Sequence, residues 1–197
     1  MASPTPTLLL LTFFFFISAS ADPDMLQDLC VADLSSGIKV NGFPCKDAAS
    51  VTSLDFFSQG LANPGLNTLG VSLSRIDYAP GGLNPPHTHP RATEVVFVLE
   101  GTLDVGFLTT ANRLISQSLK KGDVFAFPKG LVHFQKNNGK VPASVIAAFN
   151  SQLPGTQSLG ATLFGSTPPV PDNILAQAFQ TSPGTVKHIK TKFQPKK

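Results

Sequence analysis

The chain has 197 residues and a formal net charge of +3, which is long enough for one domain with a substantial core. Five of its lysines lie near the C-terminus, Trp is absent and Tyr occurs once. A nucleic-acid surface needs a basic groove interleaved with aromatic side chains, so this composition argues against nucleic-acid binding. We interpret the lysines as a solvated helix face, with acidic polysaccharide as the alternative partner.

The N-terminus has the pattern of a secretory signal peptide. Residues 8–17 are apolar and include four consecutive phenylalanines, but this run is shorter than the roughly 20 residues of a membrane span. Ala19-Ser20-Ala21 satisfies the small-x-small rule for cleavage before Asp22, although no basic residue precedes the run. We therefore expect residues 1–21 to be a signal peptide and the protein to be secreted. No second apolar stretch approaches spanning length, so no membrane span is expected.

Cys30 and Cys45 are the only cysteines, and both belong to the segment 22–62, which we expect to form an N-terminal extension. In an oxidising compartment an even pair is expected to form a disulfide. Closing a loop of this size stabilises a fold by about 3 kcal/mol in the chain-entropy estimate. Two free buried thiols are the alternative.

The central part of the chain reads as short strands separated by Gly and Pro. In the segment 69–78, Leu69, Val71 and Leu73 alternate with Ser72 and Ser74, whereas 95–99 is continuously apolar, as in a strand covered on both faces. Short strands at this regular spacing predict a sandwich or barrel. The predicted strands are residues 69–78, 95–99, 103–108, 114–119, 124–127, 132–135 and 145–149.

Three of the four histidines fall into a spacing that indicates a metal site. Side chains alternate along a strand, so His87 and His89 point the same way and can chelate one ion. Glu94 and His133 complete the set, and imidazole with carboxylate suits Mn, Fe, Ni or Zn. A metal that prefers six ligands would keep two open positions. Histidines with ordinary structural roles are the alternative, because an isolated H-x-H pair is a weak signal.

Two longer motifs contain these residues. Gly81 to Gly101 reads G-x5-H-x-H-x4-E-x6-G, and Gly122 to Asn137 reads G-x5-P-x-G-x2-H-x3-N. Both match the signature boxes of the cupins, and the chain resembles the germins and germin-like proteins of plants within them. The resemblance implies an all-β fold, a single cupin jelly-roll barrel over residues 63–165 with C-terminal α-helices. It also implies a Cys30–Cys45 bridge and one manganese per subunit, with iron as the alternative, held by His87, His89, Glu94 and His133.

Residues 166–197 are expected to form a helical segment. Asp172 follows Pro171 and is expected to cap a first helix. A second helix is expected to carry its apolar side chains on one face and its lysines on the other. The apolar positions are Ile174, Leu175, Ala178 and Phe179, then Val186, Ile189 and Phe193. In germins such helices clasp neighbouring subunits, so the resemblance implies a homo-hexamer built as a trimer of dimers. His188 has no partner at ligand spacing and is left out of the site.

The resemblance implies a protein of the plant apoplast or cell wall with a role in defence, for which three functions are open. A manganese ion cycling between Mn(II) and Mn(III) could dismutate superoxide or oxidise oxalate. A cell-wall receptor or adhesion protein could hold the metal structurally, with Lys121-Gly122-Asp123 as a weak adhesion-like tripeptide. A nutrient reservoir is the third. Acidic cell-wall polysaccharide is a candidate partner for the C-terminal lysines.

Two pocket positions separate the redox activities. Germins with oxalate oxidase activity typically have two asparagines there, of which Asn84 matches one, whereas Ser74 stands at the other. A serine hydroxyl is shorter than an amide and should not reach the same substrate oxygen, so we expect superoxide dismutation with little or no oxalate oxidation. Asn137 closes the second motif, either as a turn-stabilising amide or as a substrate contact.

The chain also departs from the germin-like pattern near Asn63, where two segments that are usually separated by a longer stretch run together. No Asn-x-Ser/Thr sequon is present, so N-glycosylation is not expected. We expect the metal motifs to be unaffected and an outer strand of the barrel to be changed or missing.

Overall fold

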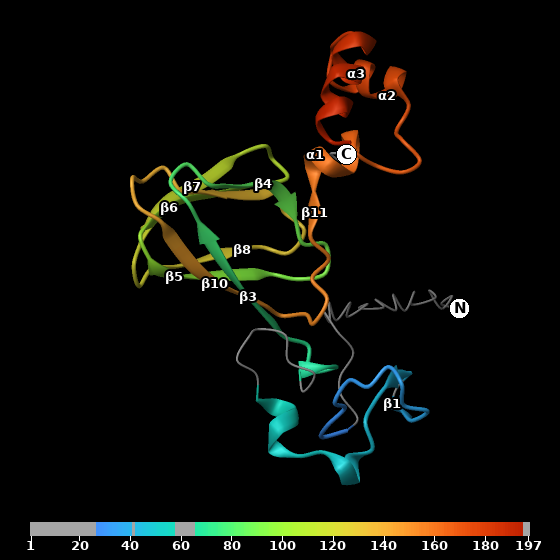
Figure 1. The fold of residues 1–197 in the computed structure, drawn as a ribbon. Helices are drawn as coiled ribbons and strands as arrows, with labels where there is room; N and C mark the ends of the chain where they lie inside the picture. The colour runs from blue at the N-terminus through green and yellow to red at the C-terminus, as the bar shows by residue number, and fades with distance from the viewer. Residues whose placement is uncertain (1–26, 41, 58–65, 195–197) are drawn as a thin grey trace, which may run out of the picture.

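The structure is a computed structural model that describes residues 27–40, 42–57 and 66–194. The predicted signal peptide lies outside these residues. The described chain consists of an N-terminal extension, a β-barrel and a C-terminal group of helices. In Figure 1 the helices lie above the barrel and the extension lies below it. Among the described helices, none is long and apolar enough to cross a membrane.

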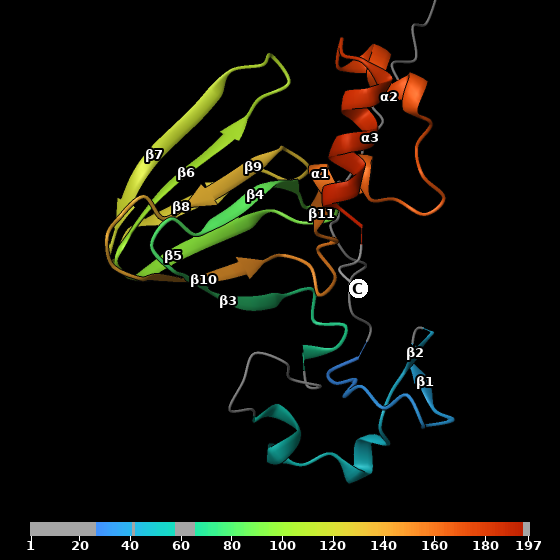
Figure 2. The same cartoon turned by 45° about the horizontal axis from the view of Figure 1, so that its top comes forward.

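Two antiparallel sheets form the barrel, and they face each other in Figure 2. The expected all-β jelly roll is confirmed. One sheet has the order β3-β10-β5-β8 and the other β11-β4-β9-β6-β7. The strands of the first sheet are β3 Ser72–Tyr78, β10 Ala143–Phe149, β5 Glu94–Glu100 and β8 Val124–Phe127. Those of the second are β11 Gln157–Ser158, β4 Leu83–Thr88, β9 His133–Lys136, β6 Thr102–Leu108 and β7 Leu114–Lys120.

The core fills the space between the sheets with side chains from alternate strand positions. Val96 and Val98 of β5 are fully buried, while Phe97 between them points to the other face. Each such side chain contributes about 1.5–3 kcal/mol relative to an exposed one. The core comprises Tyr78, Ala92, Val96, Val98, Leu103, Val105, Leu119, Phe127, Ala143, Val145, Ala147 and Phe149.

The prediction that 95–99 is covered on both faces is wrong for the described chain, because Val95 and Phe97 are 37% and 44% exposed. In β3 the two serines share the inward-facing parity with Tyr78, whereas Leu73 is 44% exposed. An antiparallel sheet buries one face within its own chain, and hydrophobicity alone does not say which face that is. We call Leu73, Val95, Phe97, Val124 and Ile146 the outer patch.

The strand register makes the outer patch continuous. Residues directly opposite on neighbouring antiparallel strands point to the same face. Ile146 lies opposite Phe97, and Phe97 lies opposite Val124. Ala148 in the adjacent row lies opposite both Leu73 and Val95. An apolar surface therefore runs across all four strands of the first sheet.

The N-terminal extension has little regular structure. It contains the two-residue strands β1 Lys39–Val40 and β2 Phe43–Pro44 and two 3-10 turns, η1 Ala48–Ser50 and η2 Ser53–Phe56. A disulfide joins Cys30 to Cys45, and both residues are buried. An ion pair of 3.0 Å between Lys46 Nζ and Asp55 Oδ1 ties the end of the hairpin to the second turn.

Three helices end the described chain: α1 Leu159–Phe164, α2 Asp172–Ala178 and α3 Pro183–Lys192. The prediction that Asp172 caps α2 is wrong, because Pro171 holds the cap position and Asp172 is the first residue of this helix. Its carboxylate instead accepts a 2.6 Å bond from Lys190 Nζ, which also donates to the carbonyl of Val170. Lys190 therefore does not share a solvated face with the other lysines, because it joins α3 to the start of α2.

Candidate metal centre

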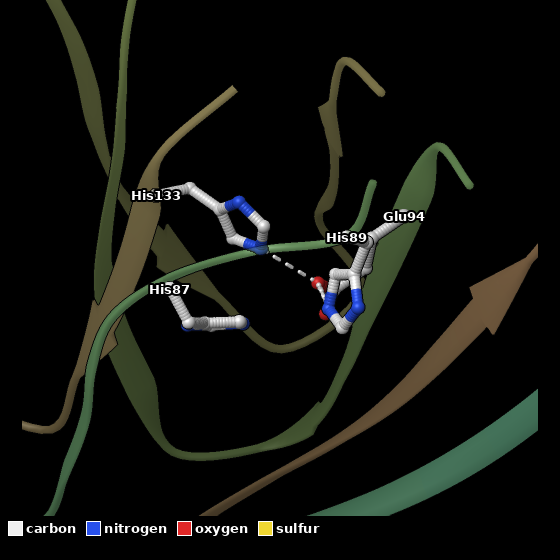
Figure 3. A group of neighbouring side chains, drawn as sticks. All are labelled: His87, His89, Glu94 and His133. Carbon is white, nitrogen blue, oxygen red and sulfur yellow. Dashed lines mark hydrogen bonds and ion pairs between the residues drawn. The ribbon is translucent and has the colours of Figure 1, made fainter. Parts of the chain in front are cut away.

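His87, His89, Glu94 and His133 converge inside the barrel (Figure 3). His87 lies in β4, and His89 is the first residue after the end of that strand. Glu94 is the first residue of β5, and His133 is the first residue of β9. One ligand atom from each residue lies within 4.8 Å of the others, and all four residues are buried. The structure thus brings together all four predicted ligands from three strands in both sheets.

Hydrogen bonds on the far side of each ring orient the histidines. His87 Nδ1 lies 2.8 Å from the carbonyl oxygen of Pro85, and His133 Nδ1 lies 2.8 Å from that of Leu131. A carbonyl only accepts, so each Nδ1 carries the proton and leaves a lone pair on Nε2. Thr156 Oγ1 lies 3.3 Å from His89 Nδ1 and can hold the third ring in the same way. Such outer contacts are typical of histidines that bind metals.

Glu94 supplies the negative charge of the cluster. Its Oε2 lies 2.9 Å from His133 Nε2 and 3.1 Å from His89 Nε2. Burial raises the pKa of the Glu94 carboxyl, but the close contacts of this carboxyl with His133 and His89 outweigh burial and lower its pKa to about 2. Burial also lowers the pKa of His87. Both shifts favour the ligating forms, an ionised carboxylate and a neutral imidazole.

This arrangement fits a cation. When Leu131 holds the proton of His133 on Nδ1, the Nε2 lone pair faces a carboxylate oxygen at 2.9 Å. Two acceptors at that distance repel each other unless a proton or a metal ion satisfies both. Three imidazole nitrogens and one carboxylate oxygen suit a divalent transition metal such as Mn, Fe, Ni or Zn, and the described cysteines are both in the disulfide, so no thiolate competes. The chain would hold such an ion through the four predicted residues.

Aromatic rings shield the cluster from solvent. Phe127 is stacked on His133 with a centroid distance of 4.5 Å, and Phe149 meets His89 edge-on at 4.8 Å. Both phenylalanines belong to the hydrophobic core. The cluster is therefore continuous with the packed interior, where charges interact more strongly than in water.

Sequence reasoning missed Gln135, which contacts Glu94 from behind. Gln135 Nε2 donates to Glu94 Oε1 at 3.2 Å, and Gln135 Oε1 accepts from Asn84 Nδ2 at 2.7 Å. Tyr78 Oη lies 3.4 Å from Gln135 Oε1 as well. Strand alternation could have identified Gln135, because it lies two residues after His133 and therefore on the same face.

The structure also places the other candidate residues. Asn84 and His87 both reach the interior because the pairing of β4 with β9 shifts register between them. Ser74 lies on the inward-facing parity of β3, opposite buried Ala147. Asn137 is a turn residue, since its amide donates to the carbonyl of Val141 at 2.8 Å and accepts from the backbone of Gly139 at 2.8 Å.

Comparisons with known proteins agree with this geometry. The sequence profile of the cupin family matches residues 58–187. Germin-like protein subfamily 2 member 1 of Arabidopsis thaliana is 84% identical over 219 residues, covering 100% of both chains. The rhicadhesin receptor of Pisum sativum is 63% identical over 194 residues, which cover 88% of this chain and 89% of the relative. A solved oxalate oxidase superposes with a TM-score of 0.82 at 44% identity, covering 87% of this chain and 98% of that one.

The alignment with the Arabidopsis relative also bears on chain length. It spans 219 residues and covers both chains fully, whereas this chain has 197, so the relative contains residues that this chain lacks. The predicted shortening near Asn63 lies outside the described residues. The four converging side chains, the two motifs and the matched barrel lead to one assignment: the chain belongs to the cupins and, within them, to the germin-like proteins.

Proposed function

We propose that this chain is a secreted manganese protein of the plant apoplast that dismutates superoxide and serves in defence. The observation that carries this proposal is the pair of acceptors, His133 Nε2 and Glu94 Oε2, that face each other in a buried three-histidine cluster. Four donors leave two positions of a six-coordinate ion for a small ligand. A manganese ion that alternates between Mn(II) and Mn(III) would convert two superoxide anions and two protons to hydrogen peroxide and dioxygen. Iron is the alternative metal.

Secretion is supported by the apolar N-terminal run with its cleavage pattern and by the Cys30–Cys45 disulfide, because disulfides persist in oxidising compartments. The lysines exposed on α3, Lys187 and Lys192, are candidate contacts for acidic cell-wall polysaccharide. Salt-dependent retention of the protein on such a polymer would be the corresponding measurement.

Ser74 is the position that we expect to decide between the redox activities. The manganese-loaded protein should dismutate superoxide and release little or no peroxide from oxalate. Of the two pocket positions, one has Ser74 in place of an asparagine. The other has Asn84, whose Nδ2 already donates to Gln135. A small dianion would lack one donor, which costs about 1–3 kcal/mol or roughly 5–150-fold in rate. Ser74→Asn should therefore raise oxalate oxidation above its starting level.

Both activities should be measured on the same manganese-loaded preparations, with Ser72→Asn as the control. Ser72 lies on the same face of β3, but its hydroxyl donates to the carbonyl of Ser151 at 2.7 Å, away from the cluster. The control should not raise oxalate oxidation. Efficient peroxide release from oxalate by the unmodified protein would contradict the specificity proposal.

A receptor or adhesion function is the second candidate, supported by the 63% identity to the rhicadhesin receptor of Pisum sativum. The metal would then be structural, and stoichiometric manganese without turnover would favour this function. The Lys121-Gly122-Asp123 tripeptide is a weak recognition element, because Asp123 Oδ2 accepts from the backbone N–H of Lys120 within the β7–β8 turn. A nutrient reservoir is the third candidate.

The chain is also proposed to assemble into a homo-oligomer, with a hexamer built as a trimer of dimers as the expected form. The outer patch supports this proposal, since a continuous apolar sheet face on a soluble chain marks an association surface. Phe97 is the largest side chain of the patch and lies at its centre, between Ile146 and Val124.

Phe97→Glu should lower the assembled mass measured by light scattering, because it places a charge at the centre of an apolar contact. Leu34→Glu is the matched control, since Leu34 is exposed in the N-terminal extension and does not belong to the outer patch. The control should keep the mass of the unmodified protein. An unchanged mass for Phe97→Glu would exclude the outer patch as the interface.

A further inference from the structure

We propose that Gln135 is a positioning residue that restricts Glu94 to binding a metal through one oxygen, which keeps a coordination position open for the substrate. This inference rests on the proposed metal site. Gln135 is completely buried, and its side-chain amide lies between Glu94 on one side and Asn84 and Tyr78 on the other.

The direction of this amide is set by its neighbours. An ionised carboxylate only accepts hydrogen bonds, so the Gln135 atom that faces Glu94 must be the NH2 group. Gln135 Oε1 must then point the other way, where Asn84 Nδ2 donates to it at 2.7 Å and the Tyr78 hydroxyl lies at 3.4 Å. The two hydrogen bonds therefore run in one direction: Asn84 donates to Gln135, and Gln135 donates to Glu94.

The two oxygens of Glu94 consequently have different partners. Oε2 faces the Nε2 atoms of His133 and His89 at 2.9 and 3.1 Å, whereas Oε1 accepts from Gln135 at 3.2 Å. A carboxylate can bind a metal through one oxygen or both. Gln135 therefore competes with an ion for Oε1, whereas Oε2 faces the histidine nitrogens and is the oxygen that would bind the ion. Two of the six coordination positions of the ion then remain open. If Glu94 bound through both oxygens, only one position would remain open.

The test uses Mn(II) alone as the probe. Gln135→Met keeps the length of the side chain and removes the amide, so Glu94 becomes free to bind through both oxygens. The water-proton relaxation enhancement of bound Mn(II) scales with the number of waters on the ion. It should fall to about half, because one of two open positions is lost. The Mn(II) EPR spectrum should change with it, while binding stoichiometry is retained.

Asn84→Asp tests the same inference with Gln135 in place. The introduced carboxylate can only accept, so the amide of Gln135 must turn its NH2 toward that carboxylate and its oxygen toward Glu94. The hydrogen bond to Glu94 is then lost, and this variant should reproduce the relaxation and EPR changes of Gln135→Met. Tyr78→Phe is the control, because it removes the hydroxyl that lies 3.4 Å from Gln135 Oε1 and leaves the shorter bond that Asn84 donates to Gln135.

Several outcomes would overturn the inference. Unchanged relaxation and EPR spectra in both variants would show that Gln135 does not control the binding mode of Glu94. Loss of Mn(II) from both would also contradict it, because the four donors are intact and should still bind the ion. If the unmodified protein bound no manganese or iron at the four residues, the proposed site itself would fail, so the two failures are distinguishable.

Discussion

Purified His89→Ala protein should lose nearly all of its bound metal. The substitution removes one donor of four and leaves Glu94 Oε2 without one of its two imidazole neighbours. Changing a residue that only supports a ligand typically weakens metal binding by 10–100-fold, so removing a ligand should weaken it by at least about 100-fold. Metal analysis after dialysis against a fixed manganese concentration would measure the loss.

His188→Ala provides the matched control, because it makes the same chemical change in an exposed residue on α3 that is outside the cluster. It should keep the metal content of the unmodified protein. If His89→Ala retained full manganese occupancy, the assignment of the four ligands would be wrong.

Asn137→Ala should produce the largest loss of stability among the polar substitutions considered. Asn137 is completely buried, and its amide bonds the backbone at Val141, Gly139 and Ala79. Asn137 Nδ2 also reaches the buried carbonyl of Tyr78 at 3.3 Å. Alanine would remove all of these bonds and leave this buried carbonyl without the amide, which should lower the free energy of unfolding by about 1–3 kcal/mol. Urea denaturation of the metal-free protein would measure this without interference from metal binding.

The neighbouring residue Asn138 is the control for this experiment. Its side chain is exposed and donates one bond to Asp104, so Asn138→Ala should cost less than about 1 kcal/mol. Equal effects of the two substitutions would contradict the role of Asn137 in the turn. Asn137→Ala should also leave Mn(II) binding stoichiometric under native conditions, as expected for an amide that has no contact with the cluster.

The histidine pair was the most predictable part of the candidate metal centre, since local strand geometry determines it, whereas Glu94 and His133 were recognised from the spacing of the two motifs. Strand alternation alone places His87 and His89 on one side, and the structure confirms that both face Glu94 and His133. The strand segments were also recognisable, because Gly and Pro interrupt each apolar run. The predicted segments differ from the observed strands at their ends, as for 69–78, which begins at Ser72 in the structure, and they do not include β4 Leu83–Thr88.

Features that depend on contacts between distant residues were not predictable. The serines of β3 face inward and Leu73 outward, which a hydrophobic pattern would not suggest. Lys190 donates a hydrogen bond to Asp172, although Lys190 was expected to be a solvated side chain and Asp172 to cap a helix. The link from Asn84 through Gln135 to Glu94 requires the register shift in β4. Each of these depends on how separate strands or helices meet.

The alternation of β5 has a thermodynamic consequence. Glu94 points to the metal centre, while Val95 and Phe97 on the same strand lie in the outer patch. Suppose that covering the patch shifts β5 and changes the affinity of Glu94 for an ion by some factor. The ion must then change the affinity of the patch for its partner by that same factor, because linkage between two equilibria is reciprocal. Assembly measured with and without manganese would give this coupling free energy directly.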